Sequence, residues 1–191
     1  MQGSQEIILA VLPSEDSTVM IKNATVSLLV LALGWAAVEG FYVNDFDQDA
    51  RLECPANQIF SFIGSIHSNP YEDRRWEFRC RPARGATSNC HWTNYVNEFE
   101  QPVLYNCPGD EVLHGMMSYH HDGPQDRRFM FQCCDVAYRY PRTCSYTIYV
   151  NYLNHPMNYH VPVGMAIKGA YSYHDNSYED RQWQFNVCYL I

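Results

Sequence analysis

The tripeptide Tyr-Val-Asn occurs three times in this chain, at residues 42–44, 95–97 and 149–151. An Asp-Arg pair follows each copy, beginning at residues 73, 126 and 180, so the intervals are 53 and 54 residues. Repeats of this length are usually supersecondary units that stack and share one hydrophobic core. The sequence therefore predicts one domain, residues 41–191, built from three units at about residues 41–90, 90–142 and 144–191.

Residues 1–40 lie outside the repeat and resemble a secretory signal peptide. A charged start at Lys22 precedes an apolar stretch over residues 24–37, and small residues suitable for cleavage follow it. The stretch is shorter than a membrane span requires, with an uncleaved anchor as the alternative. We expect the mature chain to begin near Phe41, and either Met1 or Met20 is the initiator.

The cysteines recur at fixed intervals within the repeat. Two intervals of 26 residues and two of 44 residues occupy equivalent positions, and a cysteine-rich secreted domain usually carries a disulfide framework. Because Cys133 and Cys134 are adjacent, an exchange of their partners Cys90 and Cys107 is the alternative pairing. The predicted bridges are Cys54–Cys80, Cys107–Cys133, Cys90–Cys134 and Cys144–Cys188.

Units that lack a bridge lack both of its cysteines. Val161 and Val187 stand where the third unit would carry the shorter bridge. Ala37 and Arg81 stand where the first unit would carry the longer one. This paired loss supports the predicted connectivity.

Each unit contains a segment that alternates between apolar and polar residues, as residues 73–80 do. Such alternation predicts a half-buried strand. An earlier strand is expected at residues 59–66, 112–119 and 163–173, and no stretch after residue 40 has helical periodicity. We predict an all-β, disulfide-stapled domain with pseudo-threefold symmetry, a three-sheet β-prism with a β-trefoil as the alternative. The structural positions of the repeated motif are Asp73, Trp76, Phe78, Asp126, Phe129, Phe131, Asp180, Trp183 and Phe185.

A histidine precedes each repeated aspartate by six residues, at His67, His120 and His174. A polar group present in every unit is more often structural than catalytic, because a catalytic site is usually one asymmetric constellation. We expect the aspartates to accept hydrogen bonds from backbone groups or arginines that fix the turn. The histidines are also candidate ligand-binding residues, as parts of three equivalent sugar sites.

Arginines cluster beside the repeated aspartates, and guanidinium groups suit sulfate and carboxylate ligands. Ordinary ion pairs on a solvated sheet are the alternative interpretation. No nucleophile elbow, zinc motif or phosphate loop occurs, so we predict no enzyme activity, no metal and no cofactor. The acidic net charge of −8 argues against a nucleic-acid partner. The candidate ligand-binding arginines are Arg74, Arg75, Arg79, Arg127, Arg128 and Arg181.

Three copies of Asp-Arg-x-(Trp/Phe)-x-Phe, the Phe-Gln-Cys-Cys segment at residues 131–134 and 15 tyrosines in an acidic chain resemble the dermatopontin family. The spacing of the units is also similar to the β-prism repeats of vitelline-membrane outer-layer proteins. The dermatopontin resemblance implies a secreted, non-catalytic extracellular matrix protein that associates with collagen, dermatan-sulfate proteoglycan and cell surfaces. It also implies tyrosine sulfation, for which Tyr42, Tyr71 and Tyr178 have acidic neighbours. This chain lacks the late C-terminal bridge of the vertebrate members.

Two functional hypotheses follow from the residues and the resemblance. The first is a matrix and adhesion protein that binds collagen or glycosaminoglycan through arginines and tyrosines. The second is a lectin-like haemagglutinin, a blood-cell aggregation factor or a shell-matrix protein, as in invertebrate members of the family. Salt-sensitive binding indicates the first, and sugar-competed binding indicates the second.

Overall fold

A computed structural model describes residues 41–191, which lie in one compact unit. The predicted leader at residues 1–40 lies outside the described residues. Within residues 41–191 there is no helix, so none could cross a membrane there. The strands are β1 (Ala50–Glu53), β2 (Gln58–Ser68), β3 (Asp73–Pro82), β4 (Thr87–Trp92), β5 (Val103–Asn106), β6 (Val112–His121), β7 (Asp126–Val136), β8 (Pro141–Tyr146), β9 (Met157–His160), β10 (Met165–Asp175) and β11 (Asp180–Leu190).

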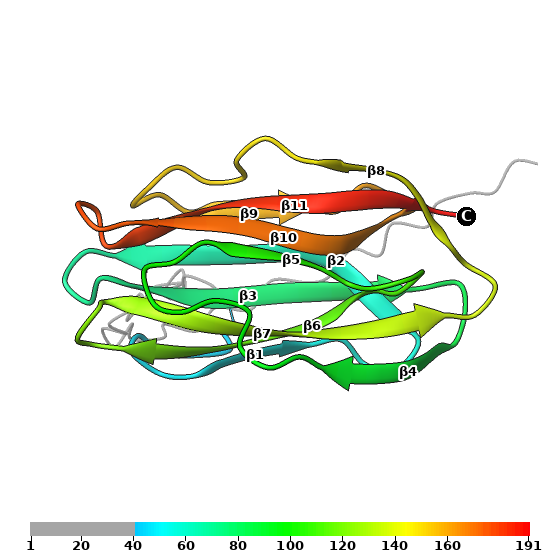
Figure 1. The fold of residues 1–191 in the computed structure, drawn as a ribbon, viewed down its shortest axis with the longest axis horizontal. Coiled ribbons are helices and arrows are strands. Elements are labelled where there is room, and N and C mark those ends of the chain that lie inside the picture. The colour runs from blue at the N-terminus through cyan, green and yellow to red at the C-terminus, as the bar shows by residue number, and fades with distance from the viewer. Residues whose placement is uncertain (1–40) are drawn as a thin grey trace, which may run out of the picture. The chain divides into compact units, whose positions relative to one another are not determined.

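The strands form three antiparallel sheets, each built around one long hairpin. The sheet orders are β1-β6-β7-β4, β5-β10-β11-β8 and β3-β2-β9. The short strands β1, β5 and β9 each pair with the hairpin of another unit: β1 with β6, β5 with β10, and β9 with β2. The three units are therefore joined in a closed cycle by backbone hydrogen bonds. The turns of all three hairpins lie at the same end, on the left of Figure 1, away from the C-terminus.

The alternating segments form β3, β7 and β11, the second strand of each hairpin, which confirms the all-β prediction. The first predicted strands, at residues 59–66 and 112–119, fall inside β2 and β6, and the third strand begins two residues later than predicted, at Met165. The register of every hairpin shifts once, between Phe60 and Phe62, Leu113 and Gly115, and Ile167 and Gly169. Each shift inserts one extra residue, which bends the strand and increases its twist.

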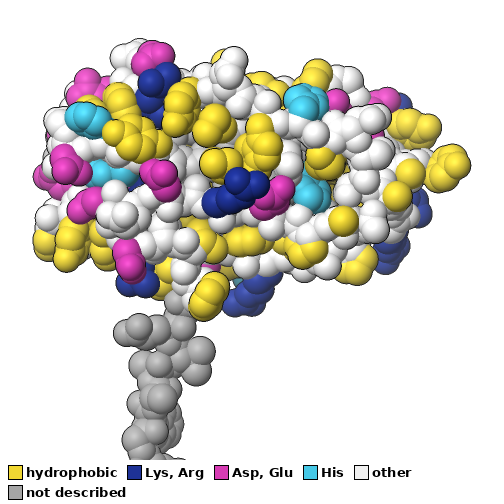
Figure 2. Space-filling view, turned by 90° about the horizontal axis from the view of Figure 1, so that it is seen from below, with side chains coloured by type: hydrophobic (Ala, Val, Ile, Leu, Met, Phe, Trp, Pro, Cys, Tyr) yellow, Lys and Arg dark blue, Asp and Glu magenta, His cyan; other side chains and the backbone are white. Residues whose placement is uncertain are grey.

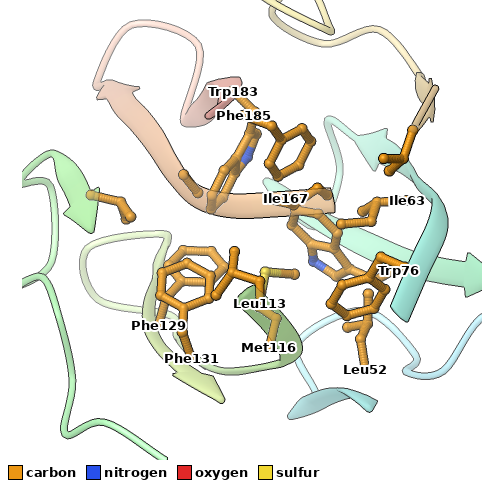
Figure 3. Close-up of a cluster of buried hydrophobic side chains, with 14 of the residues drawn as sticks. Leu52, Ile63, Trp76, Leu113, Met116, Phe129, Phe131, Ile167, Trp183 and Phe185 are labelled. Carbon is orange, nitrogen blue, oxygen red and sulfur yellow. The ribbon is translucent and has the colours of Figure 1, made fainter. Parts of the chain in front are cut away.

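Three aromatic side chains from the three hairpins meet in the core. Trp76, Phe129 and Trp183 are each at most 1% exposed and pack edge to face, with ring centroids 4.8–6.3 Å apart. Figure 3 shows these side chains pointing toward one another from β3, β7 and β11. Edge-to-face pairs add about 0.5–1.5 kcal/mol each to the free energy of burial. The aromatic positions predicted for the core are therefore correct for these three residues.

The asparagine of each Tyr-Val-Asn motif fastens its loop to a hairpin. The side chain of Asn44 donates to the Arg74 carbonyl at 3.1 Å and accepts from the Trp76 amide at 2.9 Å. Asn97 bonds to residues 127 and 129 in the same way, and Asn151 to residues 181 and 183. The amide therefore replaces a missing neighbouring strand at these backbone groups, which explains why the motif recurs with each hairpin.

Four disulfides connect the strands, with the partners that the cysteine spacing predicts. They are Cys54–Cys80, Cys107–Cys133, Cys90–Cys134 and Cys144–Cys188, and no free cysteine occurs in residues 41–191. The alternative exchange at Cys133 and Cys134 is not observed.

Candidate functional site

The repeated Asp-Arg pairs form a cycle of ion pairs in the interior. Arg127 donates from Nε and Nη2 to both carboxylate oxygens of Asp73, at 2.6 and 2.7 Å. Arg181 bonds to Asp126 and Arg74 to Asp180 with the same two-pronged geometry. All six side chains are at most 4% exposed. Each aspartate thus binds the arginine of another unit, not its own neighbour in the sequence.

Backbone groups complete this cycle. Asp73, Asp126 and Asp180 each accept a backbone N–H bond, from Asp47, Glu100 and Asn154 respectively, at 2.7–2.8 Å. A buried carboxylate needs such partners, because burial without them costs several kcal/mol. The aspartates therefore have the partners expected of a structural role.

The cycle leaves no room for a ligand. The hollow beside it, lined by Asp126, Arg181 and Trp183 among others, has a volume of only about 20 Å³. That volume holds about one water molecule. The pKa of Glu179, which lines this hollow, is raised because its carboxyl group is partly buried. The attraction of His174 opposes this shift. Arg74, Arg127 and Arg181 are consequently not placed to bind a polymer, which corrects their assignment as surface ligand-binding residues.

The three repeated histidines are also buried, with each side chain only 1% exposed. His67 Nδ1 lies 3.2 Å from Asn69 Oδ1, and His174 Nδ1 lies 3.2 Å from Asn176 Oδ1. His120 faces two carboxylates instead, those of Asp47 and Asp122. Burial contradicts the prediction that these histidines form three sugar sites, because a sugar could not reach them.

The other predicted arginines lie on the surface, where they stack on aromatic rings. Arg75 lies 4.6 Å from the Tyr42 ring and Arg128 lies 4.3 Å from the Tyr95 ring. Each also pairs with an acid, Arg75 with Asp45 at 3.7 Å and Arg128 with Glu98 at 3.2 Å. Arg79 is exposed and stacks on Phe62 at 4.9 Å. Stacking leaves the guanidinium edge available for an anion.

A basic hollow is formed by Arg81, Arg84 and Arg139. It has a volume of about 290 Å³, an apolar wall that includes Ile59 and Leu190, and no acidic residue in its lining. Arg81 is held rigidly, because it donates to the carbonyls of residues 161, 162 and 165 at 2.6–2.8 Å. The pKa of Arg81 is lowered, first by burial and then by the nearby positive charge of Arg84. This hollow is therefore a site of concentrated positive charge.

None of Arg81, Arg84 and Arg139 was among the ligand-binding arginines predicted from the sequence. Arg139 comes from the second unit and reaches the first only through the fold, where its Nε donates to the Arg84 carbonyl at 3.4 Å. The available signal was Arg81 itself, which stands at a cysteine position of the repeat. A charged residue in place of a buried cysteine indicates a local change of role.

A second hollow, of about 260 Å³, lies on the outer face of the β5-β10-β11-β8 sheet. It is lined by Leu104, Tyr146, Tyr171 and Gln184. Nearby, Asn106 donates to the Tyr146 hydroxyl at 3.0 Å. Aromatic rings beside amide side chains offer both stacking surface and hydrogen-bond partners.

The candidate sulfation sites differ in exposure. Tyr71 and Tyr178 are 51% and 52% exposed. Tyr42 is partly buried beneath Arg75. Tyr71 also stacks on Phe46, with ring centroids 4.9 Å apart. Only Tyr71 and Tyr178 present most of the ring to solvent, as an enzyme that modifies the hydroxyl would require.

Comparison with known proteins places this geometry in a family. A dermatopontin from Biomphalaria glabrata is 44% identical over 147 residues, covering 77% of this chain and 99% of the relative. A haemagglutinin/amebocyte aggregation factor from Limulus polyphemus is 38% identical over 151 residues, covering 78% and 87%. Human dermatopontin is 27% identical over 158 residues, covering 77% and 76%.

No solved structure matches this chain. The family model described as Dermatopontin matches residues 44–190, which include all three Asp-Arg pairs and all eight cysteines. Together with the similarity to the Biomphalaria protein over nearly its whole length, this match shows that the chain belongs to the dermatopontin family.

Proposed function

We propose that the chain is a secreted, non-catalytic extracellular matrix protein that binds the sulfated glycosaminoglycan chains of proteoglycans, dermatan sulfate among them, and collagen. In this role it contributes to matrix assembly and cell adhesion. We further propose that the three cyclically linked sheets form a β-prism with pseudo-threefold symmetry, a β-trefoil being the alternative. The observation that carries the functional proposal is the Arg81-Arg84-Arg139 hollow, which has no carboxylate in its lining.

The chemistry of the hollow suits a sulfated sugar. Arg81 uses its guanidinium to bind three backbone carbonyls, so Arg84 and Arg139 supply the free positive charge. Guanidinium groups bind sulfate oxygens through charge-assisted hydrogen bonds. The apolar wall formed by Ile59, Val163 and Leu190 offers contact area for a sugar ring.

Replacement of Arg84 and Arg139 by alanine is expected to weaken binding to dermatan sulfate at least tenfold. Each charge-assisted hydrogen bond contributes about 1.5–3 kcal/mol, and about 1.4 kcal/mol corresponds to a factor of ten. The measurement is the dissociation constant for dermatan sulfate at two salt concentrations, together with the elution salt on a heparin column.

Arg142→Ala is the matched control. Arg142 is also exposed, but it pairs with Asp110 at 2.6 Å, so its charge is already compensated. We expect this variant to elute as the unmodified protein does. Equal shifts in the control and in the double variant would show that net charge alone causes retention, and would contradict the proposed site.

The Limulus relative is named as a haemagglutinin and amebocyte aggregation factor. This name favours a second candidate function, the agglutination of cells. We propose as the alternative that the hollow at Leu104, Tyr146, Tyr171 and Gln184 binds a neutral sugar on cell surfaces. The proposed site replaces the buried His and Asp positions, because this hollow presents aromatic and amide groups to solvent and those positions do not.

Agglutination of erythrocytes separates the two functions. If the alternative is correct, Tyr171→Ala abolishes agglutination, simple sugars inhibit it, and moderate salt does not. Arg84→Ala/Arg139→Ala should leave it unchanged. Agglutination that persists in Tyr171→Ala would contradict the sugar site.

A further inference from the structure

The three buried histidines are equivalent in sequence but not in surroundings. The Nδ1 atoms of His67 and His174 each have an asparagine amide oxygen at 3.2 Å. At the corresponding position, the Nδ1 atom of His120 has the carboxylate of Asp122 at 3.5 Å. The carboxylate of Asp47 lies 3.6 Å from the same nitrogen. Among the three histidines, two carboxylates therefore face Nδ1 only at His120, whereas the acids near His174, Asp126 and Glu179, lie beside its Nε2.

The donor atoms of this cluster have no hydrogen-bond partner. Both ring nitrogens of His120 and Oδ1 of Asp47 are buried and unpaired. Buried polar groups are normally paired, and an unpaired one costs about 1–3 kcal/mol. An ion held between His120 Nδ1 and Asp47 Oδ1 would pair these two atoms and remove their share of this cost.

The distances fit a metal ion. His120 Nδ1 lies 3.6 Å from Asp47 Oδ1 and 3.5 Å from Asp122 Oδ1, and all three donor atoms lie within 4.8 Å of one another. Tetrahedral zinc with bonds of about 2.0–2.2 Å separates its ligands by roughly 3.4 Å. Zinc is usually four-coordinate, so three protein ligands leave a fourth position for water. Asp122 brings its carboxylate from the solvent side, because its side chain is 85% exposed.

The fold holds two of the three ligands in place. His120 lies near the end of β6, and Asp47 is fixed because its backbone N–H donates to Asp73 at 2.8 Å. Asp122 follows in the turn before β7 and can adjust to an ion. The positively charged Arg127 lies nearby and donates to the Gln48 carbonyl, but Asp73 neutralises its charge through two hydrogen bonds. Figure 2 shows acidic and histidine side chains gathered at the end of the molecule that carries the hairpin turns.

We propose that Asp47, His120 and Asp122 form a binding site for a divalent transition-metal ion, with Zn²⁺ as the best-fitting ion. The imidazole ligand selects zinc, copper or nickel over calcium, which prefers a shell of oxygen ligands. Nδ1 binds the ion and Nε2 carries the ring proton. The other histidine and cysteine cluster, Cys90, His114 and Cys134, is not such a site, because its cysteines are joined in a disulfide.

The test is a titration of the oxidised full-length chain with Zn²⁺, followed by calorimetry. We expect one ion per chain, and Asp122→Asn should weaken binding by about a hundredfold, because removal of even a supporting residue costs 10–100-fold. The substitution is suited to the fold, since Asn69 and Asn176 occupy the equivalent positions beside His67 and His174. Zn²⁺ should also raise the melting temperature of the unmodified protein but not of the variant.

Asp49→Asn is the matched control, because it removes the same charge from an exposed residue of the loop that carries Asp47. It should bind Zn²⁺ as the unmodified chain does. The proposal fails if Zn²⁺ does not bind, if Asp122→Asn binds it equally well through surface histidines, or if equimolar Ca²⁺ displaces it.

Discussion

Arg127→Met is expected to lower the free energy of unfolding by about 3–5 kcal/mol, because it leaves the Asp73 carboxylate buried without its counter-charge. Asp73 is 2% exposed and receives two hydrogen bonds from Arg127. The substitution also removes the bonds from Arg127 to the Ser118 hydroxyl and the Gln48 carbonyl. Domains of this size are stable by only about 5–15 kcal/mol, so this loss should be large enough to measure by guanidinium denaturation with the disulfides intact.

Two further variants test whether charge is the cause. Arg127→Met combined with Asp73→Asn should recover part of the loss, because no unpaired charge is then buried and the amide oxygen can still accept from Asp47. Arg128→Met changes the next residue, whose side chain is 27% exposed and pairs with Glu98, so it should cost less than about 1 kcal/mol. If Arg127→Met costs no more than Arg128→Met, the ion-pair cycle does not hold the units together.

The sequence predicted the elements of the fold that depend on local pattern. Alternation identified the hairpin strands because one face of each is buried, with Trp76, Phe129 and Trp183 at the centre. Cysteine spacing identified the bridges because the repeat supplies the same interval twice. The short strands β1, β5 and β9 were not predicted, because four residues carry little periodicity and their pairing with another unit depends on distant contacts.

The candidate sites were predicted less well, for a physical reason. A repeated Asp-Arg pair in sequence gives no indication that each residue binds a partner 54, 55 or 106 residues away. Burial of Arg74, Arg127 and Arg181 follows from that exchange of partners, so neighbouring charges in the sequence could not show it. Arg75 and Arg79, by contrast, lie on the face of β3 opposite to Arg74, as the alternation predicts. Arg75 is half-buried and Arg79 is exposed.

Asymmetry between units proved the more informative signal. Arg81 replaces a cysteine and lines the basic hollow, and Asp122 replaces the asparagine found at positions 69 and 176. Both departures are visible in the sequence once the units are superposed. Their consequence depends on Arg139, which the fold brings beside Arg84, and on Asp47, which the fold brings beside His120.

Replacement of Cys54 and Cys80 by valine is expected to lower the free energy of unfolding by about 3.5 kcal/mol. The bridge closes a segment with a separation of 26 residues, and its loss restores the conformational entropy of the unfolded chain by about that amount. Valine is the appropriate substitute, because Val161 and Val187 occupy the equivalent positions of the third unit and are 3% and 6% exposed in the same core. Packing is thereby largely kept, and the measured change reports the covalent link.

Comparison with the longer bridge distinguishes chain entropy from packing. Cys90–Cys134 closes a separation of 44 residues, for which the entropic account gives about 4 kcal/mol. Cys90 is exposed, whereas Cys54 is buried, so packing alone would make the longer bridge the cheaper one to remove. We therefore expect Cys90→Ala/Cys134→Ala to cost at least as much as Cys54→Val/Cys80→Val in denaturation under non-reducing conditions. The reverse order would mean that the buried sulfur atoms stabilise the domain mainly by filling its core.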